Sequence, residues 1–367
     1  MISSAEIGVA LSAPLVLDRS ERRSIFYLKT DVKLRDLQSL RARAECALRE
    51  RTSVIAGLAA EFGYATHAEP IAAGSYHVVH KIGSAKTGLA VVRSTLSGVF
   101  AEDRSLLAES FARHWLSGCG QGDRVPRTYA VRFIKDGAPF DFAVSEFVTS
   151  PCLRDLGDSI LDEEPHWLFA LGRVLRDTHV VEGSGAGLLD TDYDEPPKAP
   201  IGVHYAWGDY MFLNLKAHVQ TCRDAALIDA ALAAHIMHLS EAMRPALDNR
   251  PMRLLHGDPG THNVCVSLTT KQVVSLLDWE DSLVGDPLFD VAMAATFQPP
   301  RRSPPLMDGY GLGAASVEER RLLAFYFLRI SLSKTVHRFR FGIPDQPGRT
   351  PGHHRIFRGV EELGRLL

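Results

Sequence analysis

The chain has 367 residues, of which 46% are hydrophobic and 23% charged, and its formal net charge is −3. This length and apolar content are enough to bury two cores or one large bilobal core. The nearly balanced charge excludes the basic excess typical of nucleic-acid-binding proteins and the acidic excess typical of disordered chains. We therefore expect a globular protein, a monomer or homodimer, with no nucleic acid as partner.

Cysteine usage and the N-terminal sequence indicate the compartment. The five cysteines are isolated, and none forms a Cys-x-x-Cys pair or a zinc-ligand spacing with histidine, so a reducing compartment is the simplest explanation. The apolar stretch 8–17 is short, interrupted by Pro14 and not preceded by positive charge, so it is a poor signal peptide and too short to span a bilayer. These features predict a soluble, cytoplasmic protein with no membrane contact.

Periodicity in the first half of the chain predicts a small antiparallel sheet. Residues 1–33 show no sustained period and are expected to form an N-terminal arm. Apolar residues then recur at helical spacing to about residue 62, which predicts one or two helices. Short segments rich in β-branched or aromatic residues follow, separated by glycine-containing turns and by one helical stretch at about 102–116. The four predicted sheet segments are 69–83, 88–95, 128–135 and 140–148.

The pattern turns helical after Pro151. A wide loop at 183–203 and a short strand pair at about 263–278 are expected to interrupt the helices. The predicted helices are 153–161, 164–182, 205–221, 225–248, about 286–297 and 316–340. The sequence thus predicts an α+β fold with two lobes, 34–148 and 149–367, joined by an extended crossing near 144–150.

The strongest functional signal is HGDPGTHN at 256–263, followed after a predicted hairpin by DWE at 278–280. Asp258 stands five residues before Asn263, and a strand then delivers Asp278. Phosphoryl transfer needs one carboxylate to orient the attacking hydroxyl, and an amide and a second carboxylate to hold magnesium against nucleotide phosphates. Oxygen ligands suit Mg²⁺, and the neighbouring histidines are not spaced as a zinc site. The alternative, that both aspartates only pair with local backbone, does not account for the whole string.

Together with GDPLFD at 285–290, these motifs resemble the aminoglycoside phosphotransferase family, which shares the protein-kinase fold. The similarity covers about residues 50–340. It implies a bilobal kinase-like fold, small-molecule kinase activity, a small-molecule hydroxyl acceptor, and ATP (or GTP) with Mg²⁺ as cofactors. The implied roles are catalytic base for Asp258, a hydrogen-bonded brace of the catalytic loop for His256, magnesium ligands for Asn263 and Asp278, and structural anchors for Asp286 and Asp290.

The segment GVHYAWGDY at 202–210 is similar, more particularly, to the hygromycin-phosphotransferase branch, as is the spacing of the catalytic loop. That branch implies an antibiotic-like acceptor, such as an aminoglycoside, an aminocyclitol or a nucleoside antibiotic, and a role in resistance. Packing on a helix is the alternative for the aromatic residues of this segment. The residues expected to contact the acceptor are Trp207, Asp209, Glu280 and Asp281.

The small lobe contains the elements that a nucleotide requires. A glycine-bearing hairpin lets backbone N–H groups approach the phosphates, and the predicted hairpin at 73–79, with Gly74 and Ser75, resembles the family's nucleotide loop. By the same resemblance, the carbonyl of Glu146 and the N–H of Val148 face adenine.

Arg93 stands where the family carries a strand-borne lysine. This is a departure, although arginine keeps the positive charge and can bind phosphate oxygens bidentately. Its expected partner on the following helix is Glu109, with Glu102 as the competitor and a solvated helix face as the alternative for either.

Three other functions stay open at this point. A protein kinase of the usual kind carries lysine two residues after the catalytic aspartate and Asp-Phe-Gly at the metal strand, whereas this chain has Gly260 and Asp278-Trp279-Glu280. A nucleotide-binding pseudokinase is kept open by Arg93 and the N-terminal arm, although Asp258, Asn263 and Asp278 are intact. A kinase of a primary metabolite is the third alternative.

The charge pattern bears on the acceptor. Acidic stretches at 155–164 and 190–195 could flank a cleft, although solvated loops are their ordinary interpretation. From Arg329 to the C-terminus the chain has eight basic and three acidic residues. If part of this stretch closes over the acceptor, we expect it to repel polycations and to suit a neutral, weakly cationic or anionic compound.

Overall fold

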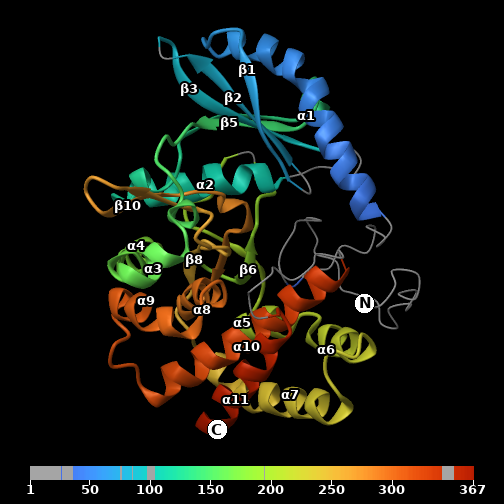
Figure 1. Ribbon diagram of the computed structural model, residues 1–367, viewed down its shortest axis with the longest axis vertical. Coiled ribbons are helices and arrows are strands. Elements are labelled where there is room, and N and C mark those ends of the chain that lie inside the picture. Colours follow the sequence, from blue (N-terminus) through green and yellow to red (C-terminus); the bar gives the residue numbers. More distant parts are fainter. Residues whose placement is uncertain are drawn as a thin grey trace.

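The computed structural model describes Phe26 and residues 36–74, 77–84, 86–96, 104–193, 195–340 and 351–367. Ser75 and Glu102, and the predicted N-terminal arm apart from Phe26, lie outside these residues. Figure 1 shows a sheet-containing lobe above a larger, mainly helical lobe. The predicted α+β architecture with two lobes is confirmed. Within the described residues, every helix is too short or too polar to cross a membrane.

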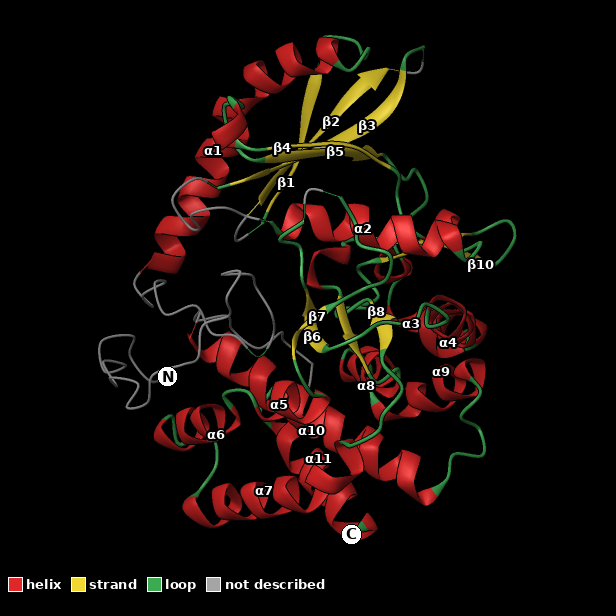
Figure 2. Cartoon of the chain, turned by 180° about the vertical axis from the view of Figure 1, so that it is seen from behind, coloured by secondary structure: helices red, strands yellow, loops and turns green. Residues whose placement is uncertain are grey.

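The smaller lobe is a five-stranded antiparallel sheet in the order β1-β2-β3-β5-β4. Helix α1 (Asp36–Glu61) lies along the sheet (Figure 2) and packs Ile55 and Ala59 against the apolar side chains of the strands. In the central strand β3, buried and less buried positions largely alternate, because α1 covers one face of the sheet. Their bounds are β1 Ala68–Ala73, β2 His77–Ser84, β3 Gly88–Thr95, β4 Thr128–Arg132 and β5 Phe142–Glu146.

Helix α2 (Ser105–Gly118) lies between the sheet and the helical lobe (Figures 1 and 2). Its apolar face, including Phe111 and Trp115, joins a core cluster with Leu276 and Trp279 of the larger lobe. The helix is thus anchored on the larger lobe, and its opposite side carries Glu109 towards the sheet.

The larger lobe surrounds an aromatic core. Trp207, Tyr210, Phe289 and Tyr326 pack together there, and Phe26 joins them with no exposed surface. The helices are α3 Asp158–Glu163, α4 His166–Thr178, α5 Trp207–Phe212, α6 Leu215–Asp224, α7 Ala230–Met243, α8 Leu288–Thr296, α9 Ser303–Tyr310, α10 Val317–Arg340 and α11 His354–Leu366.

Arg329 of α10 is buried in this core. Its guanidinium lies 3.8 Å from the centroid of the Phe26 ring and donates hydrogen bonds to the carbonyl oxygens of Met211 (2.7 Å) and Leu213. Burial lowers the pKa of Arg329 to about 9. The Phe26 ring therefore covers a cation whose donors satisfy the end of α5.

Two predictions from the sequence are wrong in detail. The stretch 183–203 is not a simple loop: it contains β6 (Ala186–Leu189) and β7 (Gly202–His204), which join β11 (Leu283–Gly285) and β8 (Arg253–Leu255) in the order β7-β6-β11-β8. The pairing of β6 with β11 is distant in sequence, so local periodicity did not show it.

The helix predicted over 205–221 is interrupted between α5 and α6. Asn214 adopts a left-handed conformation with φ 56°, which α-helices do not contain, and its Nδ2 donates to the Phe26 carbonyl oxygen at 2.9 Å. The interruption thus depends on a contact with a residue far away in sequence. The predicted strand pair is present as β9 (Val264–Ser267) and β10 (Gln272–Leu276).

Candidate active site

The catalytic loop leaves β8 and is braced by a neutral histidine. The Asp258 backbone N–H donates to His256 Nδ1 at 3.2 Å, so the other ring nitrogen carries the proton and donates to the Leu277 carbonyl oxygen at 2.8 Å. Burial lowers the pKa of His256, which favours this neutral form. His256 therefore links the segment that carries Asp258 to the segment that carries Asp278.

A buried carboxylate fixes the loop from below. Asp290 of α8 accepts the backbone N–H groups of His256 (2.7 Å) and Gly257 (3.0 Å), and its Oδ2 lies 3.1 Å from His179 Nε2. Gly257 has φ 85°, and a Cβ there would lie 2.1 Å from the Asp281 carbonyl oxygen. Only glycine fits this turn without displacing the chain.

Asp286 is the second anchor of α8. Its Oδ1 accepts the Leu288 N–H at 3.0 Å, and its Oδ2 accepts from Arg250 Nε (2.6 Å) and from the Tyr326 hydroxyl (2.8 Å). That hydroxyl in turn accepts from Trp207 Nε1 at 2.9 Å. Trp207 is 3% exposed, so the expectation that it contacts an acceptor is corrected: it packs in the core.

Asp258 is partly exposed, and both of its oxygens face a basic side chain. His262 Nε2 lies 3.3 Å from Oδ2, and Lys334 Nζ of α10 lies 3.2 Å from Oδ1. Burial raises the pKa of Asp258, but Lys334 and His262 outweigh it, so the pKa lies well below its ordinary value. Asp258 is thus held as a carboxylate able to accept a hydrogen bond from a hydroxyl. Neither contact with Asp258 was expected from the sequence, although His262 lies within the motif.

Asn263 and Asp278 emerge at the same end of the β9–β10 hairpin. The Leu277 N–H donates to the Asn263 carbonyl oxygen at 2.7 Å, which continues the strand pairing to the residue before Asp278. Asn263 Nδ2 donates to the Asp258 carbonyl oxygen at 3.0 Å, which leaves the side-chain oxygen available as a ligand. Asp278 has φ 64°, unusual for an aspartate, at the turn into Trp279–Asp281.

This donor set fits magnesium only in company with a nucleotide. Both side chains offer oxygen, which Mg²⁺ prefers. Among the described residues, no group of three or more His, Cys, Asp or Glu side chains could hold a metal ion. Phosphate oxygens and waters would therefore have to complete the octahedral shell around an ion at Asn263 and Asp278.

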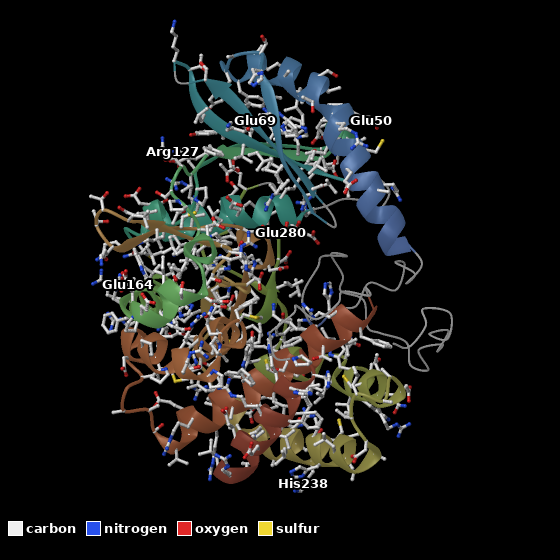
Figure 3. The ribbon with its side chains drawn as sticks, viewed as in Figure 1. Glu50, Glu69, Arg127, Glu164, His238 and Glu280 are labelled. Atoms are coloured by element: carbon white, nitrogen blue, oxygen red, sulfur yellow. The ribbon has the colours of Figure 1, made fainter. Side chains whose placement is uncertain are left out.

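Arg93 of β3 crosses from the sheet to three carboxylates. Its Nη1 lies 2.5 Å from Asp278 Oδ1 and 3.6 Å from Glu280 Oε2, and its Nη2 lies 3.5 Å from Glu109 Oε2. The expected pairing with Glu109 is present. Figure 3 shows Glu280 at the junction of the two lobes. The structure thus places Glu280 beside Arg93, a contact that the sequence analysis did not predict.

Three carboxylates surround one arginine in this cluster, and His77 Nδ1 lies 3.4 Å from Glu280 Oε2. Burial raises the pKa of Glu109 to about 7. Partial removal from water and the neighbouring Glu280 carboxylate raise the pKa of Asp278 against the opposing effect of Arg93. The raised values indicate a site that favours an additional cation.

We expect Arg93→Ala to raise KM for the nucleotide and to lower kcat, because truncating one partner of a buried charge pair costs about 2–5 kcal/mol. Arg93→Lys should recover part of the loss because it keeps the charge without the bidentate fork. Steady-state kinetics with varied nucleotide measure both effects. The matched control is Arg365→Ala, since Arg365 pairs with Glu361 on the exposed side of α11. Unaltered nucleotide kinetics in Arg93→Ala would transfer the role to another cation, with Lys81 the first to test.

The remaining nucleotide predictions fall on plausible elements. The Gly74 N–H donates to the His77 carbonyl oxygen at 2.8 Å and closes the β1–β2 hairpin. Glu146 is the last residue of β5, and Val148 follows on the crossing between the lobes. Contacts of these residues with phosphate or adenine stay predictions.

The other expected acceptor residues, Asp209 and Asp281, lie on different elements. Asp209 lies at the start of α5, where its Oδ2 accepts the Ala206 N–H at 3.3 Å. Asp281 lies beside Gly257, close to the catalytic loop. Of the two, Asp281 is therefore the one next to the loop that carries Asp258.

A family model described as the phosphotransferase enzyme family (APH) matches residues 67–326. No curated protein matches the sequence. Among solved structures, the chain is similar to a thermostable mutant of aminoglycoside phosphotransferase APH(4)-Ia in ternary complex with AMP-PNP and hygromycin B. The TM-score is 0.61 at 17% identity, covering 85% of this chain and 99% of that chain.

Two further solved structures carry other kinase names. A choline/ethanolamine kinase family protein from Mesorhizobium loti has a TM-score of 0.56 at 17% identity, covering 88% of this chain and 94% of that chain. A candidate fructosamine-3-kinase from Thermobifida fusca YX-ER1 has a TM-score of 0.54 at 16% identity, covering 81% and 93%. At these identities the similarity shows a shared fold.

Proposed function

Because this chain belongs to the phosphotransferase enzyme family and is a small-molecule kinase, we propose that it transfers a phosphoryl group from ATP, with Mg²⁺, to a hydroxyl of an antibiotic-like natural product. GTP is the alternative donor. The observation that carries the proposal is the meeting of Asp258, Asn263, Asp278 and Arg93 where the two lobes join. A pseudokinase is disfavoured because each residue that the chemistry requires is present and held by specific contacts.

In this proposal each residue has one task. Magnesium, when bound with the nucleotide, supplies positive charge to the phosphates. Asn263 and Asp278 offer it oxygen ligands, and Arg93 binds phosphate oxygens from the sheet side. Asp258 accepts a hydrogen bond from the acceptor hydroxyl and takes its proton. His256 holds the loop so that Asp258 and Asp278 keep their spacing.

For the acceptor we propose a compound of low positive charge, such as a hygromycin-type aminocyclitol or a nucleoside antibiotic, with resistance as the biological role. Two observations support this choice. The ammonium group of Lys334 lies beside the base. In the first acidic stretch, Asp158 and Asp162 are already bound to Arg302, at 2.8 and 2.7 Å. The positive charge of Lys334 beside Asp258 disfavours a ligand with several ammonium groups, and Asp158 and Asp162 are not free to offset it.

A kinase of a primary metabolite is the second candidate. It stays open because the TM-scores for the choline/ethanolamine kinase family protein and the aminoglycoside phosphotransferase are similar, 0.56 and 0.61. Fold similarity alone does not separate these substrate classes. The proposed cytoplasmic setting suits both candidates and agrees with the five free cysteines.

We expect kcat/KM to fall as the number of ammonium groups on the acceptor rises, with kanamycin-like compounds poor and weakly charged ones better. The measurement is nucleotide consumption across a graded acceptor panel that includes aminocyclitols, nucleoside antibiotics and primary-metabolite alcohols. The discrimination should weaken at moderate salt, because salt screens exposed charges. Highest activity on the most cationic compounds would overturn the charge argument and leave the kinase assignment standing.

A further inference from the structure

Lys334 lies beside Asp258, but the proposed function gives it no role in the phosphoryl transfer itself. It lies on α10, far in sequence from the catalytic loop, yet its Nζ is 3.2 Å from Asp258 Oδ1. The loop HGDPGTHN itself contains neither lysine nor arginine. The helix therefore brings a permanent cation to a loop that has none of its own.

The position of this ammonium is defined by packing. Lys334 Nζ lies 4.2 Å from the centroid of the Phe297 ring, at the end of α8. The His262 ring contacts the same phenyl ring edge-on, with centroids 5.4 Å apart. A cation over an aromatic face is held with modest but real attraction. Phe297 thus sets the positions of the two basic side chains that approach the two oxygens of Asp258.

The cluster is also open to a ligand. Lys334 is 21% exposed and Asp258 22%, so neither is sealed in the core. In contrast, Arg329 on the same helix is fully buried and binds carbonyl oxygens. Arg329 and Lys334, two of the basic residues of α10, therefore have different surroundings: Arg329 serves the core, whereas Lys334 lies beside Asp258.

We propose that Lys334 is a catalytic residue whose ammonium group contacts the transferred phosphoryl group while it holds Asp258 in place. The hydroxyl bound to Asp258 must lie within bonding reach of the γ-phosphorus, so a cation that touches Asp258 is also close to the equatorial phosphoryl oxygens. During transfer, the negative charge on these phosphoryl oxygens is redistributed, although its total changes little. A cation that is already in position stabilises this charge in the transition state, because the site is partly shielded from water.

The step balances without a change in Lys334. A bond forms between the acceptor oxygen and the γ-phosphorus, and the bond from that phosphorus to the β–γ bridging oxygen breaks. The nucleoside diphosphate leaves with the electron pair, and the hydroxyl proton passes to Asp258. Lys334 keeps its three protons throughout and acts by charge and hydrogen bonding alone.

This inference rests on the proposed function, and its test uses water and a productive hydroxyl compound from the panel as phosphoryl acceptors. Lys334→Met in the full chain should lower kcat for MgATP turnover by about 10²–10³-fold, the effect of removing one preorganised donor. KM for MgATP should change by less than about threefold, because the nucleotide is held elsewhere. Lys334→Arg should retain most of the activity. The control is Lys271→Met, since Lys271 pairs with Glu164 on the surface, 3.2 Å away, and should turn over like wild type.

A purely structural role is separated by a double-mutant cycle. In the Asp258→Asn background, Lys334→Met should cost much less than in wild type, because the two groups act on the same step. If Lys334→Arg is as inactive as Lys334→Met and both melt at a lower temperature, the residue is structural and the inference fails. Wild type that turns over MgATP, with Lys334→Met within about threefold of it, overturns the inference alone. If the wild-type protein does not turn over MgATP with any of the acceptors tested, water included, both the proposed function and this inference are overturned.

Discussion

Asp258→Asn is expected to lower kcat by about 10²–10⁴-fold, the range for loss of a general base. The amide keeps the size of the side chain but cannot take the proton of the attacking hydroxyl. Affinity for the nucleotide should stay nearly unchanged, because the contact of Asn263 is with the Asp258 backbone carbonyl and survives the substitution. Kinetics at saturating acceptor and calorimetry of nucleotide binding separate the two effects.

A matched aspartate outside the site serves as the control for Asp258. Asp224 of α6 accepts a hydrogen bond from Gln220 at 2.6 Å, so Asp224→Asn makes the same chemical change away from the catalytic loop. It should leave kcat unaltered. Turnover by Asp258→Asn within about threefold of wild type would make the assignment of Asp258 as base wrong.

Asp278→Ala is expected to abolish activity and to weaken magnesium-dependent nucleotide binding sharply. The substitution removes one of the two proposed protein ligands of the ion, and Mg²⁺ is poorly held by Asn263 alone. Calorimetric titration of ATP with and without magnesium measures the change. Unchanged magnesium dependence in the variant would contradict the assignment of Asp278 as a ligand.

The magnesium-free arm of that titration carries a second expectation. Arg93 Nη1 donates a hydrogen bond to Asp278 Oδ1 at 2.5 Å. Asp278→Ala releases this guanidinium and removes a negative charge that repels phosphate. ATP binding without magnesium should therefore be retained or strengthened. A variant that loses ATP binding equally with and without magnesium would indicate a damaged fold instead of a lost ligand.

Local patterns predicted the β9–β10 strand pair, which is present. The role of Asp290 as an anchor was implied by the resemblance to the family, and Asp290 does accept the His256 N–H at 2.7 Å. The sheet and most helices follow from periodicity. The pairing of Arg93 with Glu109 was expected from the resemblance to the family, with Glu102 as competitor, and it is present.

Contacts between distant segments could not be predicted in this way. Nothing in the local pattern shows that Lys334 meets Asp258, because that contact depends on how α10 crosses the lobe. The packing of Phe26 in the core and the pairing of β6 with β11 are likewise contacts between segments that are distant in sequence.

The expectation that the basic residues from Arg329 to the C-terminus lie together over the acceptor is wrong in part. Their positions depend on contacts between segments that are distant in sequence. Lys334 reaches the site, but Arg329 is buried among carbonyl oxygens, and Arg358 pairs with Glu362 on α11 at 2.8 Å. Asp345 and Arg349 lie outside the described residues. Of this basic stretch, Lys334 is therefore the residue that supports a weakly charged acceptor, beside the pairing of Asp158 and Asp162 with Arg302.

The central claim, that this chain phosphorylates a small-molecule hydroxyl, is tested most directly by the stoichiometry of transfer. The purified protein is incubated with γ-labelled ATP, magnesium and the panel of hydroxyl compounds, and both the nucleoside diphosphate and the labelled product are quantified. We expect at least one compound to gain one phosphoryl group for each ATP consumed, with the transfer lost on chelation of magnesium and in Asp258→Asn. Release of label only as inorganic phosphate, or transfer that persists equally in Asp258→Asn, would contradict the claim.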